Sequence, residues 1–344
     1  LNPPPPTENY TVYKSSAASD VYKRQAQHHG DPRLMDHFRL VAEQACEIPG
    51  HEGMRPYVDF LSVSLGADGV AASAELAAGC LEQMSDSDPW RAGVCFHRGA
   101  ALLLLGHAEA ALEELERGRV LSRAFEYPLI ESLTLATMFL AQHHLEDHLH
   151  AHESYGELCA LAGHIDVSPE AMPVAAPVFT ALAFGHLLNG ASSDALHAAN
   201  VALRLTSRLG RLAPWHAVQG RLLLAKVFLA FGEASRATAL LAEADDLTGP
   251  QSACPLNDEL RTEVRRALAV ADDPATQAGE LTMAEIRVLQ YLPTHLTFPD
   301  IADELYVSRY TVKTQALAVY RKLGVHSRSD AVERARLLGL LPPK

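Results

Sequence analysis

The sequence predicts an all-α protein in which an array of helical hairpins precedes a small domain of four helices. Between residues 26 and 270 the chain is rich in Ala, Leu and Glu, and its apolar residues recur at helical spacing. A glycine followed by an alanine at a fixed interval repeats along the same stretch. Residues 281–344 contain four short segments that each begin with a helix-capping residue. These three observations define the expected fold class.

The first repeat signal is a glycine that closes an apolar segment and is followed five residues later by alanine. The four glycines are Gly66, Gly106, Gly190 and Gly232, and the alanines are Ala71, Ala111, Ala195 and Ala237. The glycines are separated by 40, 84 and 42 residues, so a degenerate unit without its glycine is expected near residues 141–153. The pattern indicates a helix, a tight turn at glycine and a second helix packed closely through alanine.

This spacing resembles that of the tetratricopeptide repeat, although the period exceeds the usual length of about 34 residues. We therefore expect a tetratricopeptide-like array, and a generic helical bundle with chance glycines is the alternative. Residues 1–25 carry a proline run and are expected to be disordered or spurious. Residues 271–280, ADDPATQAGE, predict a linker. The expected domains are thus a repeat sensor or interaction domain at 26–270 and a terminal domain at 281–344.

The four helices of the terminal domain are predicted from their caps. The cap pairs are Thr282 with Glu285, Thr297 with Asp300, and Ser327 with Asp330, and Ser308 caps the third helix. The first helix should bury Ile286, Leu289 and Leu292, and the second Ile301, Ala302 and Leu305. A tight turn at residues 306–307 joins the second and third helices, which predicts a helix-turn-helix.

The third predicted helix, residues 308–323, has two distinct faces. Val312, Ala316, Val319 and Leu323 share the face that should be buried. The opposite face gathers Tyr310, Lys313, Thr314, Leu317, Ala318 and Arg321. Cations and small apolar side chains suit the major groove of DNA, and short polar groups near the helix start suit phosphates. The predicted DNA-contacting residues are Ser308, Arg309, Tyr310, Thr311, Lys313, Thr314, Gln315, Leu317, Arg321 and Lys322.

The charge distribution agrees with this prediction. Residues 281–344 hold nine basic and six acidic side chains, a net charge of +3. The whole chain has a formal net charge of −13, which leaves −16 on residues 1–280. An acidic body with a basic terminal domain indicates that the terminal domain meets a polyanion.

The segments LTMAEIRVLQYL, IADELYVSRYTVKTQ and YRKLGVHSRSDAV resemble the LuxR-type (GerE-like) helix-turn-helix over about 60 of the 344 residues. The resemblance implies binding to double-stranded DNA, with Lys313 as the base- and phosphate-contacting lysine and Arg321 and Lys322 as the closing basic pair. Three residues depart from the family pattern. Gln315 stands where His is common, Phe298 where Asn is common, and Leu317 where the side chain is often polar.

Family members usually form dimers through the fourth helix, here residues 330–338. The residues expected to form this contact in a homodimer on DNA are Ala331, Val332, Ala335 and Leu338. The combined architecture resembles the C-terminal half of the large ATP-binding LuxR-type regulators, the family of the maltose-regulon activator. A P-loop requires Gly-Lys followed by Ser or Thr, and the sequence contains no Gly-Lys, so we expect no NTPase module within it. An unrelated repeat fused to the same output domain is the alternative.

Other signals are weaker. His144, His148 and His152 would line one face of a continuous helix, as surface residues, metal ligands or a protonation switch. Trp90 and Trp215 would either line a ligand groove or lock one repeat against the next. No G-x-S-x-G elbow or Gly-rich phosphate loop is present, so we expect no enzyme, cofactor or metal.

Composition narrows the class of protein further. The hydrophobic content of 48% excludes wholesale disorder, and the longest apolar stretches are far shorter than the roughly 20 residues that cross a bilayer. The five cysteines form no C-x-x-C pair, which fits the reducing cytoplasm. The expected protein is a cytoplasmic transcriptional regulator without membrane contact, whose repeat domain binds an effector or a protein partner. The alternative is a helical scaffold whose terminal domain makes only protein contacts.

Overall fold

The structure is a computed structural model that describes residues 40–44, 46–48, 52–66, 68–165, 173–209, 214–249, 254–272, 281–305, 307, 309–325 and 327–342. The described residues form helices and no strands, which confirms the all-α prediction. The predicted N-terminal segment 1–25 lies outside the described residues, as do residues 273–280 of the predicted linker. Residues 271–272 belong to the last helix of the array.

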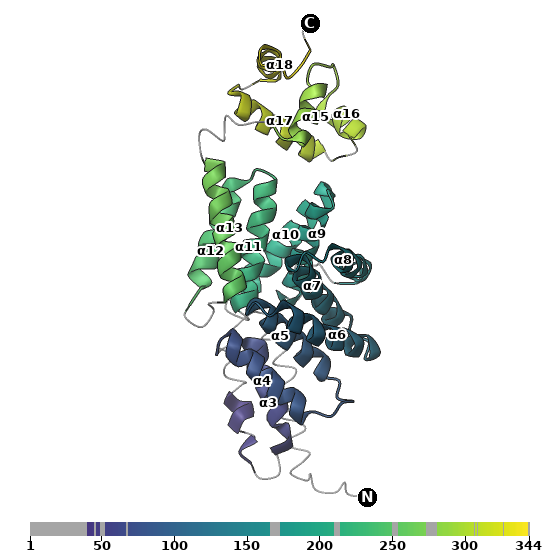
Figure 1. Ribbon diagram of the computed structural model, residues 1–344, viewed down its shortest axis with the longest axis vertical. Coiled ribbons are helices and arrows are strands. Elements are labelled where there is room, and N and C mark those ends of the chain that lie inside the picture. The colour runs from purple at the N-terminus through teal and green to yellow at the C-terminus, as the bar shows by residue number, and fades with distance from the viewer. Residues whose placement is uncertain are drawn as a thin grey trace, which may run out of the picture.

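The repeat array consists of consecutive antiparallel helix pairs and one closing helix (Figure 1). The pairs are α3 (Arg55–Leu65) with α4 (Val70–Gln83), α5 (Arg91–Leu104) with α6 (Ala108–Ala124), α7 (Pro128–His144) with α8 (His148–Ala162), α9 (Ala176–Leu188) with α10 (Ser192–Leu209), and α11 (Pro214–Ala230) with α12 (Ala234–Leu247). The closing helix is α13 (Pro255–Asp272), and short 3-10 turns, η1 (Glu52–Met54) and η2 (Pro173–Ala175), precede α3 and α9. The first helices of successive pairs contact one another, as expected for a tetratricopeptide-like array.

The hairpin turns use one recurring geometry. Gly106, Gly190 and Gly232 all adopt positive φ angles between 73° and 87°, a backbone conformation that favours glycine. The residue after each glycine donates its backbone N–H to the carbonyl five residues earlier, as from Glu233 to Phe228 at 2.9 Å. The alanines Ala111, Ala195 and Ala237 are fully buried, as predicted.

The first unit departs from the predicted spacing. Gly66 has the expected left-handed backbone, but α4 begins only at Val70, after a longer turn that contains Gly69. Ala71 is therefore exposed, and the buried residues of α4 are Val70, Ser73, Ala77 and Cys80. The prediction that Ala71 packs closely is wrong because the additional turn residues rotate the helix.

The degenerate unit lies where the spacing predicted it. Glu146 takes the place of the missing glycine between α7 and α8, with a left-handed φ of 59°. Ala151 follows five residues later and is buried, so the pattern of the other units is kept. This unit lacks the glycine of the other turns because a glutamate occupies the left-handed conformation, which most side chains avoid.

The inner helices of the array are buried on all sides. Residues 178–185 of α9 and 215–225 of α11 are buried without interruption, so these described helices leave no open groove between them. Trp215 is only 3% exposed, and its indole lies directly on Gly66, where an added β-carbon would be 1.8 Å from Cη2. The proposed ligand groove lined by tryptophans is therefore wrong for Trp215, which locks α11 against the α3–α4 turn.

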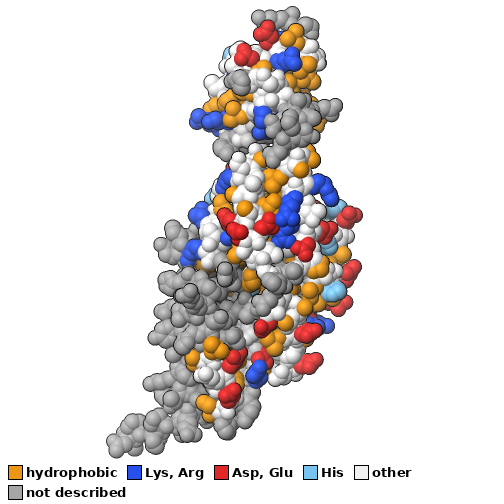
Figure 2. Space-filling model, turned by 90° about the vertical axis from the view of Figure 1, so that its left-hand side faces the viewer, with side chains coloured by type: hydrophobic (Ala, Val, Ile, Leu, Met, Phe, Trp, Pro, Cys, Tyr) orange, Lys and Arg blue, Asp and Glu red, His pale blue; other side chains and the backbone are white. Residues whose placement is uncertain are grey.

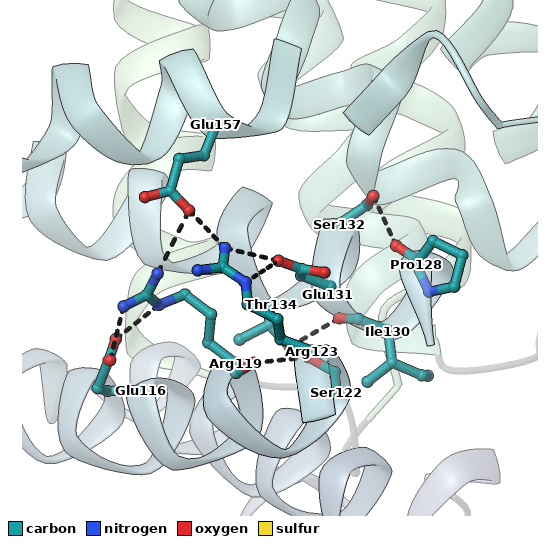
Figure 3. Close-up of polar contacts among 10 residues, drawn as sticks. All are labelled: Glu116, Arg119, Ser122, Arg123, Pro128, Ile130, Glu131, Ser132, Thr134 and Glu157. Atoms are coloured by element: carbon teal, nitrogen blue, oxygen red, sulfur yellow. Dashed lines mark hydrogen bonds and ion pairs between the residues drawn. The ribbon is translucent and has the colours of Figure 1, made fainter. Parts of the chain in front are cut away.

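An ion-pair network joins two successive pairs on the outside of the array (Figure 3). Arg119 on α6 pairs with Glu116 at 2.7 Å and with Glu157 on α8 at 3.3 Å. Arg123 pairs with the same Glu157 at 2.9 Å and with Glu131 on α7 at 2.7 Å. Because one carboxylate is shared by two arginines, the network holds α6, α7 and α8 in register.

The histidine-rich stretch is not one continuous helix. α7 ends at His144 and α8 begins at His148, so the predicted stripe of His144, His148 and His152 is interrupted by the hairpin turn. Asp147 instead caps α8 and accepts a hydrogen bond from His150 Nδ1 at 2.7 Å, which raises the pKa of His150. Among the described residues, no group of three His, Cys, Asp or Glu side chains is arranged to hold a metal ion.

The terminal domain contains α15 (Met283–Tyr291), α16 (Phe298–Leu305), α17 (Arg309–Leu323) and α18 (Arg328–Leu337). Its core is separate from that of the array, and α17 contributes Val312, Ala316, Val319 and Leu323, which confirms the predicted inner face. In α15, Val288 is buried in place of Ile286, which is half-buried, and Leu305 of α16 is likewise half-buried. No helix in the described part of the chain has both the length and the apolar character to span a membrane.

We predict that Ala237→Leu lowers the free energy of unfolding by about 1–3 kcal/mol, because Ala237 is fully buried and a larger side chain overpacks the hairpin. The measurement is denaturant unfolding followed by circular dichroism. Ala239→Leu, at an exposed position of the same helix, is the matched control and should leave stability nearly unchanged. Equal effects of the two substitutions would contradict the close-packed hairpin.

Candidate DNA-binding surface

The outer face of α17 carries a stripe of exposed side chains. Lys313 and Arg321 are exposed, and Leu317, between them, has 54% of its surface accessible. Thr314 and Ala318 are half-buried beside them. The five residues lie on one side of the helix because its other side is fixed in the domain core. The stripe thus combines two cations with a solvent-exposed apolar side chain. Packing inside the domain does not explain why these side chains are there.

The remaining predicted contact residues fall into three situations. Arg309 is exposed at the start of α17, and Gln315 is half-buried. Thr311 is buried, so its hydroxyl is less accessible than the sequence suggested. Ser308 lies outside the described residues, and Tyr310 belongs to α17 with a side chain that is not described.

Lys322 is turned toward the domain rather than toward solvent. Its ammonium donates to Glu285 Oε2 at 2.7 Å, and both side chains are largely covered. The same Glu285 carboxylate accepts the backbone N–H of Thr282 at 2.7 Å and completes the predicted capping box of α15. Lys322 thus fixes the end of α17 to the start of α15, and its charge is partly neutralised.

The second helix also has its predicted cap. Thr297 donates its hydroxyl to Asp300 Oδ2 at 2.6 Å and its backbone N–H at 2.8 Å. These two hydrogen bonds lower the pKa of Asp300, so the carboxylate stays charged at the N-terminus of α16. The cap sets where α16 begins and therefore how the α16–α17 turn presents the recognition helix.

Arg328 is the structural residue that the sequence analysis missed. Its guanidinium donates to the backbone carbonyls of Leu292 at 2.9 Å, Leu296 at 2.8 Å, Thr294 at 2.9 Å and Tyr291 at 3.3 Å. These carbonyls belong to the end of α15 and the loop that follows, where the helix dipole favours a cation. Arg328 therefore clamps α18 to α15. The signal in the sequence is an arginine directly after the cap Ser327.

The fourth helix presents a different surface from the one predicted. Ala331, Val332 and Ala335 are buried in the core of their own domain. The small core uses all of the surface of the two alanines and leaves 9% of Val332 exposed, so these three residues offer a second copy much less surface than the sequence suggested. Leu338 is 52% exposed as expected, and Leu337 beside it is 75% exposed. Leu340 follows with a smaller exposed area.

Four short helices with a separate core, a tight α16–α17 turn and an exposed cationic stripe on α17 define a helix-turn-helix domain. Residues 280–335 match the family of bacterial regulatory proteins described as the luxR family, and this segment is a LuxR-type helix-turn-helix domain. The match confirms the family resemblance seen in the sequence.

Two relatives align with the same terminal part of the chain. The HTH-type transcriptional activator RamA of Corynebacterium glutamicum is 38% identical over 66 residues, which are 19% of this chain and 24% of RamA. The Fimbriae Z protein of Escherichia coli K12 is 36% identical over 61 residues, 18% of this chain and 29% of that protein. The chain thus spans less than a third of each relative.

We predict that Arg328→Met destabilises the terminal domain by about 2–3 kcal/mol, because four backbone carbonyls lose a charged donor. Arg328→Lys should not restore stability, since one ammonium cannot replace the planar fork. Calorimetry of the full chain should show a lowered transition for the terminal domain and an unchanged one for the array. Arg287→Met, at an exposed arginine of α15, is the control. If the terminal domain of the Arg328→Met variant unfolds at the same temperature as that of the Arg287→Met control, Arg328 does not clamp α18 to α15.

Proposed function

We propose that this chain is a DNA-binding transcriptional regulator in which α17 enters the major groove of double-stranded DNA. The exposed stripe of Lys313, Leu317 and Arg321 within a LuxR-type domain carries the proposal. A helix of this size fits a groove about 12 Å wide, and lysine or arginine can donate to guanine O6 and N7. Both relatives support it, since one is named as a transcriptional activator and both share the terminal domain.

Leu317 supports a partly apolar readout of the base pairs. A leucine that is 54% exposed on a cationic helix gains from contact with the C5-methyl group of thymine. Arg309, exposed at the start of α17, is suited to a phosphate, as is the helix N-terminus itself. The base-contacting role therefore falls on Lys313, Thr314, Leu317 and Arg321, with Gln315 flanking them. Lys322, held by Glu285, acts mainly within the domain.

The repeat array is proposed to control this activity by binding an effector or a protein partner. The array buries its inner helices, so a partner would meet its outer surface and turns rather than a tryptophan-lined groove. Acidic side chains recur along the array on the face shown in Figure 2, which does not favour contact with DNA. We place the protein in the bacterial cytoplasm, where its DNA target lies, and assign it no enzymatic activity.

We predict that the full chain binds duplex DNA with an affinity that falls steeply with salt, by about 0.9 in the log–log slope for each neutralised phosphate. Lys313→Ala should weaken binding by about 1–3 kcal/mol if the lysine contacts guanine. The measurement is fluorescence anisotropy with a random duplex library at several salt concentrations. Arg266→Ala, at an exposed cation of the array, removes the same charge and should have little effect. A folded chain without DNA affinity at low salt would favour the scaffold alternative.

The regulator is further proposed to act as a homodimer on DNA. One recognition helix reads only a few base pairs, too few to select a site in a genome. The exposed Leu337 lines a groove of about 950 Å³, and the exposed Leu338 follows it in the chain. The other lining residues are the apolar Leu292, Pro293 and Val332 and the polar Arg328, Ser329, Glu333 and Arg336. Leucines of one copy can enter the groove of the other in a self-complementary, two-fold contact. The two half-sites would then lie about one helical turn apart or a multiple of it.

We predict that the double substitution Leu337→Glu and Leu338→Glu abolishes cooperative binding to a two-site operator and leaves weak binding to a half-site. Two carboxylates would have to be buried in the dimer, which is costly. Binding is measured as a titration of operators with one and two half-sites. Met283→Glu, at a strongly exposed position of α15, should leave cooperativity unchanged. Full cooperativity in the double variant would show that the dimer forms elsewhere.

A further inference from the structure

The terminal domain lies over the last turns of the repeat array (Figure 1). The space between them is a cleft of about 440 Å³. On the array side it is lined by the ends of α9 and α11, including Leu187, Leu229 and Phe231. On the other side it is lined by α17, including Thr314, Ala318 and Arg321.

The face of α17 that lines this cleft overlaps with the face proposed to read DNA. The lining residues Thr314, Ala318 and Arg321 recur at three- and four-residue intervals, so they lie on one side of the helix. All three belong to the predicted groove face, and two of them are half-buried. Lys313 and Leu317 lie on the adjoining strip of the helix and remain exposed. The array thus faces one flank of the recognition surface.

At the α11–α12 turn the array comes near Arg321 of α17. A β-carbon placed on Gly232 would lie 3.9 Å from Nη2 of Arg321, which is van der Waals distance. A recognition helix in the major groove is flanked on both sides by the sugar-phosphate strands. The array turn at Gly232 lies next to Arg321, on a flank of α17 along which one of these strands would run.

We propose that the end of the array formed by the α9–α10 and α11–α12 turns is a docking surface for the recognition helix of the same chain. This inference rests on the proposed function, since it assigns a regulatory role to the DNA-reading face. The half-buried Leu187, Leu229 and Phe231 offer an apolar surface to Ala318 and to the aliphatic stem of Arg321. Docking masks the reading face, and DNA binds only the undocked state. An effector that displaces the array then raises the DNA affinity.

Replacing Ala230 with either a positive or a negative side chain tests whether the array masks the recognition helix. Ala230 is exposed, lines the cleft and ends α11, so a longer side chain can be placed there without disturbing the core. Ala230→Arg repels Arg321 and should raise the DNA affinity of the full chain about two- to fivefold, the scale of a partly exposed charge pair. Ala230→Glu attracts Arg321 and should lower the affinity by a similar factor.

The matched controls are Ala239→Arg and Ala239→Glu, at an exposed position of α12 that does not line the cleft. They change the net charge of the acidic array by the same amount. If the Ala230 and Ala239 variants change the DNA affinity equally, the effect is one of net charge and the masking proposal is overturned.

A second measurement detects docking without DNA. A cysteine is introduced at Ala318, which lines the cleft, or at Leu317, which does not. The rate of reaction with a bulky maleimide is followed by peptide mapping of the full chain. Ala230→Arg should speed the labelling of position 318 and leave that of position 317 unchanged, and Ala230→Glu should slow the labelling of position 318.

The labelling separates this proposal from the proposed function. Labelling that responds to Ala230 in a chain without DNA affinity supports docking and refutes the regulator. Labelling of position 318 that does not respond to Ala230 overturns docking even if the chain binds DNA. A labelling rate that falls as protein concentration rises would show that a second chain covers the helix, which also overturns contact within one chain.

Discussion

The helices of the described structure depend on packing against one another for most of their stability. They range from 8 residues in α16 to 18 in α10 and α13, and isolated helices below about 12–15 residues, such as α15, α16 and α18 of the terminal domain, are marginal in water. Packing between helices therefore decides where each helix lies. The array meets this constraint by stacking hairpins around a continuous apolar core, and the terminal domain by wrapping three helices around α17. The position of the recognition helix is consequently a property of its core.

This dependence on packing explains why the two faces of α17 have different roles. Its inner residues are buried and held further by the Lys322–Glu285 ion pair at one end of α15, while Arg328 fixes the other end of α15 to α18. The outer face contributes nothing to the domain core and is free to carry Lys313, Leu317 and Arg321. Because α17 is fixed in its domain core, the docking proposed at the α11–α12 turn would act on the whole helix.

Much of the fold could be predicted because it depends on local chemistry. Helix caps, the buried stripe of α17 and the glycine turns follow from short sequence patterns, and the structure confirms them. The error at Ala71 arose because the turn after Gly66 is longer than the spacing of the other units implied. Contacts between distant residues could not be predicted at all. No local pattern shows that Trp215 will lie on Gly66, 149 positions earlier in the chain.

At the candidate site, too, features set by local sequence could be predicted and features set by distant contacts could not. The exposed residues of α17 follow from helical periodicity, so Lys313, Leu317 and Arg321 lie where expected. The direction of Lys322 depends on a partner 37 residues away and that of Arg328 on partners 32 to 37 residues away, and the family resemblance suggested a DNA contact for Lys322. The fourth helix shows that a count of apolar residues does not reveal how many of them a small core will bury. Ala331 and Ala335 were used entirely inside the domain.

The central claim is that α17 reads DNA through its outer face. Photo-crosslinking tests it most directly, with a benzophenone amino acid at position 317 of the full chain and a duplex library at low salt. We predict crosslinks to thymine bases from position 317 and none from position 283, which is more exposed, at 72% against 54%, but lies on α15. Crosslinks from position 283 without any from position 317 would contradict it.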